Sequence, residues 1–285
     1  MNALELVCVL GAGTMGRGIA QVCAQAGHEV RLRDVDQDIL ERSKAAIKQA
    51  LDKGVQLGKV KEADATATLT RIVLHTDLAT AARDAKWVIE AVPEDVALKQ
   101  RVLKEAETHL GPEAILATNT SSLSIGTIAQ ALARPQRFVG LHFFNPPHLL
   151  KLLEVVHGPN TGKNVVAAAV DFARHLGKDP IVVKDSPGFA SSRLGLILGL
   201  EAIRMLEEGV ASAEDIDKAM ELGYNHPMGP LKLTDLVGLD VRLAIAEHLA
   251  TTLSDERFGP PALLRRLVQE GKLGKKSGQG FYSYK

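Results

Sequence analysis

A histidine near the end of one apolar segment and a glutamate inside the next are well suited to move a proton. His142 stands in Gly-Leu-His-Phe-Phe, and Glu154 stands in Leu-Leu-Glu-Val-Val. A carboxylate within an apolar run is costly to bury unless it is paired. Two neighbouring strands could bring Glu154 to His142, where it would orient the ring and raise its basicity. Such a pair suits removal of an alcohol proton while a hydride leaves, but a core ion pair without a catalytic role fits the same spacing.

A run of hydroxyl and amide side chains, Thr118-Asn119-Thr120-Ser121-Ser122, follows the carboxyl end of a predicted strand. In open α/β sheets the loops at that edge line the ligand crevice. A hydroxyl from this loop can therefore bond a substrate oxygen. The alternative is a cap for the helix that contains Ile125 and Ile128. One serine could cap that helix while the other faces the site, so the two interpretations are compatible.

The elements that would position a cofactor begin with a glycine loop, Gly11-Ala12-Gly13-Thr14-Met15-Gly16, which lies between an apolar run and a predicted helix. Gly11 permits the tight turn, Gly13 lets backbone N–H groups approach a pyrophosphate, and Gly16 lets the helix pack closely on the strand. The helix N-terminus then presents free N–H groups to the anion. An ordinary glycine turn in an α/β protein is the competing interpretation.

The end of the next predicted strand, Val30–Asp34, supports dinucleotide binding. Asp34 stands where a carboxylate accepts the adenosine ribose hydroxyls and repels a 2′-phosphate, so NAD is expected in preference to NADP. Arg33, the preceding residue, carries a guanidinium that could instead accommodate a phosphate.

Strands alternate with helices over the first two-thirds of the chain, which predicts a Rossmann-type, mostly parallel sheet. Further strands are expected at Ile72–Leu74, Trp87–Val92, Ile115–Asn119, Phe138–Phe144, Leu152–Val156 and Ile181–Val183. Residues 36–68 predict a helical hairpin that projects from the sheet. Thr161 is expected to cap a helix that ends near His175.

The pattern changes after Asp185-Ser186-Pro187-Gly188, beyond which only helical periodicity is found before the C-terminal tail. Helices are expected at 189–208, after Ser212, near 236–253 and at 260–271. We therefore predict a cofactor-binding α/β domain of residues 1–185 and an all-helical domain of residues 186–285. A small helical domain often buries its remaining apolar face in a second subunit, so a homodimer through this domain is expected.

The composition excludes several classes of partner. The 34 Lys and Arg residues balance 34 Asp and Glu residues, which argues against nucleic-acid or membrane-surface binding. No apolar run is long enough to span a bilayer, and Met1–Glu5 leads directly into the first predicted strand without a signal peptide. Cys8 and Cys23 lack metal-ligand spacing and are expected as reduced core residues. The sequence thus predicts a cytoplasmic protein with no metal site.

Together these motifs resemble those of the short-chain L-3-hydroxyacyl-CoA dehydrogenases, and the bacterial 3-hydroxybutyryl-CoA dehydrogenases are the nearest likeness. The matching segments are 11–16, 90–94, 119–123, 142–147, 153–156, 185–189, 225–230 and 274–282. They run nearly end to end, in order and with little change in spacing. Several are much more specific than the glycine loop.

The resemblance implies reversible, NAD-dependent oxidation of a (3S)-3-hydroxyacyl-CoA to the 3-oxoacyl-CoA. It assigns His142 as general base with Glu154 holding it, Ser121 as the group that binds the substrate hydroxyl, and Asn145 as a supporting residue. The positions that match cofactor contacts in this family are Gly11, Gly13, Thr14, Met15, Gly16, Asp34, Glu94, Lys99, Asn119, Ser121 and Lys276.

Two stretches carry less of the resemblance. Coenzyme A would run along the helical hairpin, where Lys53, Lys59 and Lys61 are candidate contacts, although a solvated charged face is the competing interpretation. The family usually has Asn directly before Arg193, and this chain has Ser192 there. That change puts the strength of substrate-carbonyl binding in doubt.

Two other functions are compatible with part of the pattern. A related dehydrogenase could act on a free hydroxy acid or sugar acid, and a crystallin-like relative could bind NAD without catalysis. Retention of His142, Glu154 and Ser121 favours an enzyme over the second alternative. Acyl-chain length, pathway and physiological direction stay open at this point.

Overall fold

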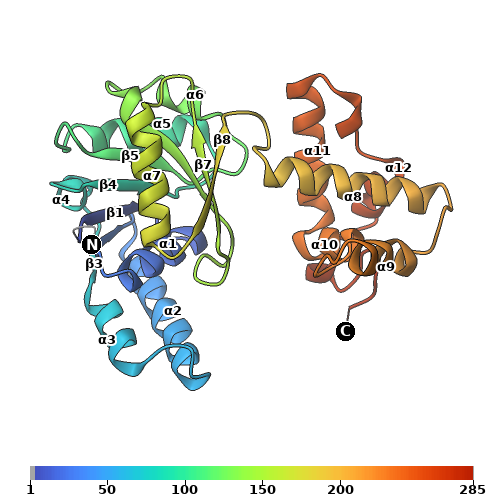
Figure 1. Cartoon of the computed structure of the whole chain (residues 1–285), viewed down its shortest axis with the longest axis horizontal. Coiled ribbons are helices and arrows are strands. Elements are labelled where there is room, and N and C mark those ends of the chain that lie inside the picture. The colour runs from blue at the N-terminus through green and yellow to red at the C-terminus, as the bar shows by residue number, and fades with distance from the viewer. Residues whose placement is uncertain (1–3, 285) are drawn as a thin grey trace. The chain divides into compact units, whose positions relative to one another are not determined.

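In the computed structural model, which describes residues 4–284, the chain divides after Ser186 into two compact units. We call them the sheet unit and the helical unit (Figure 1). Of the segment expected to lead into the first strand, residues 1–3 lie outside the described part. No described helix is long and apolar enough to cross a bilayer.

The sheet unit is built on eight strands in the order β3-β2-β1-β4-β5-β6-β7-β8. Their bounds are Leu6–Leu10 (β1), Glu29–Arg33 (β2), Ile72–His75 (β3), Trp87–Glu90 (β4), Ile115–Thr118 (β5), Phe138–Phe143 (β6), Leu152–His157 (β7) and Asp179–Lys184 (β8). All neighbouring pairs are parallel except β6 and β7, which are antiparallel. The predicted Rossmann-type, mostly parallel sheet is therefore confirmed.

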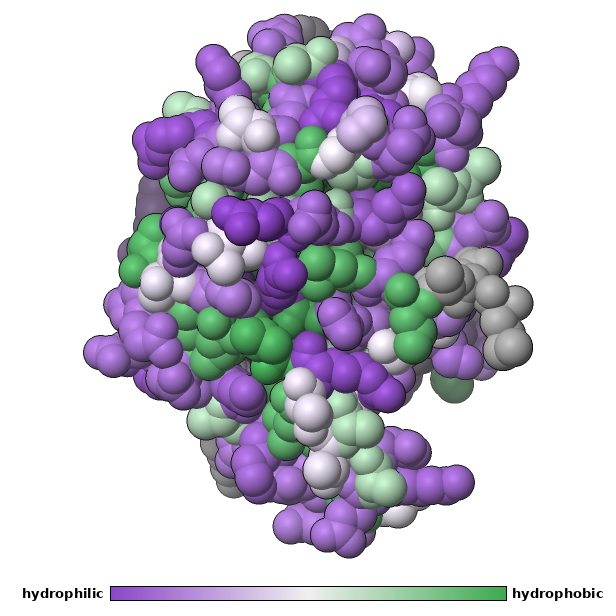
Figure 2. Space-filling view, turned by 90° about the vertical axis from the view of Figure 1, so that its left-hand side faces the viewer, coloured by the Kyte–Doolittle hydropathy of each residue, from purple (hydrophilic) through white to green (hydrophobic). Residues whose placement is uncertain are grey.

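The helices of the sheet unit are α1 (Thr14–Gln25), α2 (Gln37–Gln56), α3 (Glu62–Thr70), α4 (Leu78–Ala82), α5 (Val96–Glu107), α6 (Ile125–Ala129) and α7 (Lys163–His175), and a 3₁₀ turn, η1, spans Pro135–Arg137. Figure 1 shows α2 and α3 as a hairpin that extends away from the sheet. Helix α2 buries Leu40, Ser43, Ile47 and Leu51, a stripe at helical spacing. In Figure 2 the hairpin forms the narrow lobe at the bottom, with hydrophilic side chains at its tip.

The central strands are covered on both faces, as expected for a parallel sheet between helices. In β1 the side chains of residues 7–10 are fully buried. Cys8 of β1 and Cys23 of α1 are free thiols in this core, as predicted. Burial raises the pKa of each thiol to about 12, so neither is a reactive thiolate near neutral pH.

The helical unit comprises α8 (Ser191–Glu207), α9 (Ala213–Gly223), α10 (Pro230–Val237), α11 (Leu239–Leu253) and α12 (Ala262–Gln269), with 3₁₀ turns η2 (Glu256–Phe258) and η3 (Lys275–Ser277). No strand occurs in its described residues, so the predicted all-helical character is confirmed. The Ser212 hydroxyl accepts a hydrogen bond from the Asp215 N–H, as the capping pattern predicted.

One local prediction was wrong, and one helix was not predicted. Thr161 does not cap α7, because Gly162 is the N-cap residue. The Thr161 hydroxyl donates to the Phe138 carbonyl and accepts from the Gly158 N–H, which fixes the turn after β7. The helix predicted near 236–253 is present as α11, which starts at Leu239. Helix α10 was not predicted, and it ends at Gly238, which has a φ of +105°.

Two buried carboxylates, Asp217 and Asp235, accept hydrogen bonds from later parts of the helical unit. Asp217 accepts from the Leu231 and Lys232 N–H groups at 2.8 and 3.1 Å. Asp235 accepts from the backbone N–H groups of residues 281 and 282, both at 2.9 Å. Tyr282 and Tyr284 donate their hydroxyls to these carboxylates, which together with burial raise the pKa of both phenols. These bonds join the start of α10 and the segment 281–284 to the rest of the helical unit.

Candidate active site

The predicted pair of His142 and Glu154 is present at the carboxyl end of β6. The antiparallel register of β6 and β7 sets the two residues directly opposite each other. His142 Nδ1 lies 2.6 Å from Glu154 Oε2, with 8% of the histidine side chain and none of the glutamate side chain exposed. The Phe144 ring lies against the imidazole at 4.4 Å between centroids. Directly opposed residues of an antiparallel pair share one face, which is why two separate sequence segments meet here.

The loop after β5 lies at the same edge of the sheet. Thr118 of β5 pairs with Gly140 of β6, two residues before His142. The Asn119 N–H donates to the Glu90 carbonyl at 2.7 Å, and the Asn119 side-chain oxygen accepts from the Phe143 N–H at 2.9 Å. The first bond ties the loop to β4, and the second ties it to β6, the strand that carries the histidine.

The capping residue of α6 is Ser124, whose hydroxyl accepts from the Thr127 N–H. Neither Ser121 nor Ser122 therefore fills the capping role that the sequence left open. The Thr120 hydroxyl accepts from the Leu123 N–H at 2.9 Å and shapes the turn between them.

The glycine loop has the geometry its spacing predicts. A Cβ on Gly11, which has a φ of +98°, would lie 2.7 Å from the Ala91 carbonyl oxygen, and one on Gly16 would collide with Gly11. A Cβ on Gly13 would meet nothing within 4 Å. Packing thus requires the first and third glycines, whereas the second faces open space into which a ligand can approach.

A cavity of about 590 Å³ lies beside this loop, within the usual size range of small-molecule pockets. Asp34 lines this cavity, and its carboxylate accepts a hydrogen bond from the Ala12 N–H at 2.8 Å. This bond fixes the carboxylate relative to the glycine loop. The apolar lining comes from Val35, Ile39, Leu98 and Val102. Arg33 also reaches the cavity, but its Nε donates to the Thr76 carbonyl at 3.1 Å. No group of metal-binding side chains occurs among residues 4–284.

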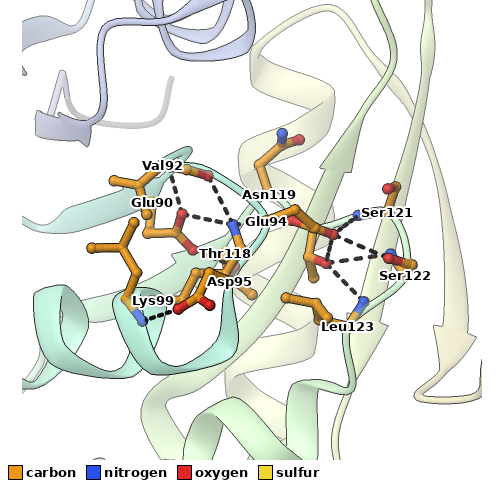
Figure 3. Close-up of polar contacts among 12 residues, drawn as sticks. Glu90, Val92, Glu94, Asp95, Lys99, Thr118, Asn119, Ser121, Ser122 and Leu123 are labelled. Atoms are coloured by element: carbon orange, nitrogen blue, oxygen red, sulfur yellow. Dashed lines mark hydrogen bonds and ion pairs between the residues drawn. The ribbon is translucent and has the colours of Figure 1, made fainter.

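Glu94 and Lys99, two predicted cofactor contacts, belong to a polar cluster at the end of β4 (Figure 3). Lys99 is fully buried, and its Nζ lies 2.8 Å from Glu90 Oε1 and 3.3 Å from Glu94 Oε2. Glu90 was not among the predicted site residues. It is nevertheless a glutamate within an apolar run, Trp87–Val92, which is the same pattern that identified Glu154.

The structure does not bring the three candidate lysines of the hairpin into one site. Lys53 lines a cavity of about 510 Å³ between α1, α2 and the segment 145–148, and Asn145 lines the same cavity. Lys59 and Lys61 line a separate cavity of about 510 Å³ that includes Arg71.

The two remaining predicted residues belong to the helical unit. Ser192 is half-buried in the first turn of α8. Lys276 Nζ contacts both oxygens of Asp240, at 2.5 and 2.6 Å. This ion pair holds the pKa of the Asp240 carboxyl below its usual value.

Two family models match nearly the whole chain. The NAD-binding domain of 3-hydroxyacyl-CoA dehydrogenase matches residues 6–186, and the C-terminal domain of 3-hydroxyacyl-CoA dehydrogenase matches residues 188–284. The chain belongs to the 3-hydroxyacyl-CoA dehydrogenase family. It is thus an oxidoreductase that uses NAD, as the glycine loop and Asp34 predicted.

Relatives with curated names support the same family. A probable 3-hydroxybutyryl-CoA dehydrogenase of Deinococcus radiodurans is 46% identical over 97% of this chain and 99% of its own length. The human mitochondrial hydroxyacyl-coenzyme A dehydrogenase is 43% identical over 98% of this chain and 91% of its own. The crystal structure of (S)-3-hydroxybutyryl-CoA dehydrogenase from Ralstonia eutropha has a TM-score of 0.95 at 41% identity and covers 99% of this chain and 100% of its own.

Proposed function

We propose that this dehydrogenase interconverts (3S)-3-hydroxybutyryl-CoA and acetoacetyl-CoA, with His142 as the general base. The observation that carries the proposal is the 2.6 Å contact between His142 Nδ1 and Glu154 Oε2 at the carboxyl end of β6. The 3-hydroxybutyryl-CoA dehydrogenase names of the similar bacterial proteins support the substrate. A free hydroxy acid is disfavoured because the chain belongs to a family that acts on CoA thioesters.

Glu154 determines which imidazole nitrogen does the chemistry. An ionised carboxylate only accepts hydrogen bonds, so Nδ1 carries the hydrogen and Nε2 keeps the lone pair that takes the hydroxyl proton. As the proton arrives, the buried carboxylate stabilises the imidazolium that forms. In the opposite direction the same nitrogen returns the proton to the carbonyl oxygen of the substrate.

The loop after β5 supplies the substrate contact. The Ser121 hydroxyl bonds the reacting substrate oxygen and orients it toward His142, and Asn145 supports the site from the segment after β6.

Ser192 supplies a minor contact, because a serine hydroxyl reaches less far than the usual Asn amide and can bridge through a water. One neutral hydrogen bond is worth about 0.5–1.5 kcal/mol, so we expect Ser192→Ala to lower kcat/KM by about two- to twelvefold. Ser192→Asn should be tolerated.

NAD, when bound, accepts the hydride from the substrate carbon. The glycine loop with Thr14 and Met15 would receive its pyrophosphate at the N-terminus of α1, and Asp34 would bind its adenosine ribose. Glu94, Lys99, Asn119 and Lys276 are further proposed contacts. Coenzyme A would follow the hairpin, and Lys53 is the favoured lysine because it shares a cavity with Asn145. Lys59 and Lys61 are alternative contacts nearer the hairpin tip.

We also propose a cytoplasmic homodimer that forms through the helical unit. Large apolar side chains of this unit are exposed, among them Leu194, Leu222, Tyr224 and Leu236 at 68, 83, 75 and 52%. Exposed apolar surface of this kind is typical of protein interfaces. Two free thiols in the core agree with a reducing compartment. Light scattering on wild type and Leu222→Glu tests the dimer, since a monomeric wild type contradicts it.

The substrate is tested by following NADH oxidation with acetoacetyl-CoA and, separately, with free acetoacetate. Activity with the thioester and little or none with the free acid supports the proposed function. Comparable or faster turnover of the free acid contradicts the thioester assignment. Absence of activity with both compounds contradicts the whole proposal and favours a non-catalytic NAD-binding relative.

A further inference from the structure

Glu90, a residue without an assigned role, ends β4 as a fully buried carboxylate. Glu90 Oε1 accepts from Lys99 Nζ at 2.8 Å and from the Val92 N–H at 2.7 Å, and its Oε2 accepts from the Thr118 hydroxyl at 2.5 Å. Desolvation raises the pKa of this carboxyl, and the Lys99 ammonium is the main opposing influence. A buried charge pair is costly unless its remaining hydrogen-bonding capacity is satisfied, and here it is satisfied on both oxygens.

The cluster continues from Lys99 to the substrate loop. Lys99 Nζ also lies 3.3 Å from Glu94 Oε2 and donates to the Val92 carbonyl at 3.2 Å. The other oxygen of Glu94 accepts from the Thr120 hydroxyl, from the Ser121 N–H at 3.2 Å and from the Ser122 hydroxyl at 3.3 Å. Figure 3 shows this unbroken series of contacts from the buried end of β4 to the loop that carries Ser121.

We propose that Glu90 is a positioning residue, which holds Lys99 in place so that Glu94 keeps the Ser121 loop in its reactive arrangement. The inference rests on the proposed function, because it takes the Ser121 hydroxyl to contact the substrate. Lys99 stands between two carboxylates, so the strength of its bond to Glu90 sets how strongly it attracts Glu94. When the Glu90 charge is removed, Lys99 draws closer to Glu94 Oε2 and the loop contacts on Oε1 loosen.

A second buried glutamate, on the helix α5 that carries Lys99, provides a matched control. Glu107, at the far end of α5, accepts from the Ala133 and Arg134 N–H groups at 2.7 and 2.9 Å and lies 3.4 Å from Arg134 Nε. Like Glu90, it is buried and paired with a cation, but it contacts none of the proposed site residues. Glu107→Gln therefore reports what loss of a buried carboxylate does to stability alone.

The experiment is a double-mutant cycle between Glu90→Gln and Ser121→Ala, assayed with acetoacetyl-CoA and NADH, with Glu107→Gln as control. If Glu90 acts through the loop, Glu90→Gln lowers kcat/KM by about two- to twelvefold, as expected when one neutral contact to the reacting oxygen is weakened. In the Ser121→Ala background the same change has little further effect, because residues that act through one another are not additive. Glu107→Gln leaves kcat/KM unchanged while it lowers the melting temperature.

Thr118→Val removes one hydrogen-bond donor to Glu90 and nearly keeps the shape of the side chain. This variant replaces Glu90→Gln in the cycle if Glu90→Gln does not fold. It is expected to show a smaller loss of kcat/KM that Ser121→Ala likewise suppresses. Additive losses in either cycle, or equal losses for Glu90→Gln and Glu107→Gln, overturn the positioning role. Failure of the proposed function looks different, because wild type itself then lacks activity with acetoacetyl-CoA or Ser121→Ala retains full activity.

Discussion

Two histidines of the sheet unit are buried to a similar degree at opposite edges of the sheet, and their surroundings differ completely. His142, 6% exposed, lies at the carboxyl edge and contacts the Glu154 carboxylate. His28, 1% exposed, lies at the amino edge directly before β2. Its ring packs against Phe172 and His175, with centroids 5.4 and 4.9 Å apart, and its Nδ1 lies 3.1 Å from the Glu5 N–H nitrogen.

Burial alone therefore does not mark a histidine as catalytic. The Nε2 atoms of His28 and His175 have no hydrogen-bond partner within residues 4–284. Burial lowers the pKa of His28, whereas His142 Nδ1 lies 2.6 Å from the Glu154 carboxylate. The carboxyl edge thus places a buried carboxylate beside its histidine, and the amino edge packs its histidine against other rings.

The largest expected effect is a rate difference between matched substitutions at these two residues. We expect His142→Gln to lower kcat by about 10²- to 10⁴-fold, the range for a positioned acid–base group. His28→Gln should leave kcat within about twofold of wild type, since a ring at the amino edge contacts none of the proposed site residues. Steady-state assays with acetoacetyl-CoA and NADH measure both. Equal kcat values for the two variants contradict the division of roles.

Phe172 tests whether the amino-edge cluster is structural. It is 4% exposed and stacks on Trp87 with centroids 4.3 Å apart, besides touching His28. We expect Phe172→Ala to cost about 3–5 kcal/mol of unfolding free energy, because a cavity replaces a buried ring. Urea unfolding gives the loss of stability, and kcat measured well below the transition should stay near that of wild type. A large fall in kcat with little loss of stability is the opposite of this expectation.

A third substitution weakens the carboxyl edge without removing its base. Glu154→Gln keeps the side-chain shape but removes the charge that favours imidazolium. In the direction of alcohol oxidation, the rising limb of the pH–rate profile should therefore move to lower pH. We also expect kcat to fall by about tenfold, less than for His142→Gln, because the base is retained but less well oriented. A profile identical to that of wild type would show that Glu154 does not influence the base.

Local patterns were sufficient to predict the part of the site that lies on paired strands. Glu154 and His142 stand in apolar runs separated by a break that neither strand could continue, and antiparallel pairing of successive strands is the simplest way to join them. The glycine loop was likewise predictable, because Gly11 and Gly16 meet backbone that is close in sequence or one strand away.

The cluster around Glu90 could not be predicted in the same way. Its cation is 9 residues away and its hydroxyl partner is 28 residues away, and only the register of β4 and β5 brings Thr118 opposite Glu90. Helix α10, which ends at Gly238, was also not predicted. A Cβ at this position would lie 3.0 Å from Asp240 Oδ1 and 3.1 Å from Lys276 Nζ, and Lys276 is far away in the sequence.

The smallest expected effect is a pH dependence of stability that originates at His28. Because folding lowers the pKa of this residue, its neutral form stabilises the protein fully above the unfolded value of about 6.5, and that contribution is lost as the pH falls through the lower folded value. His28→Gln lacks this titration. The melting temperature of wild type minus that of His28→Gln should therefore be larger at about pH 7.5 than at about pH 5.

A wild-type advantage over His28→Gln that is constant with pH, or that grows in acid, would show that the His28 ring accepts a proton in the folded state as readily as in the unfolded chain. The amino edge would then tolerate charge as the carboxyl edge does, and the separation of the two histidines by their surroundings would fail.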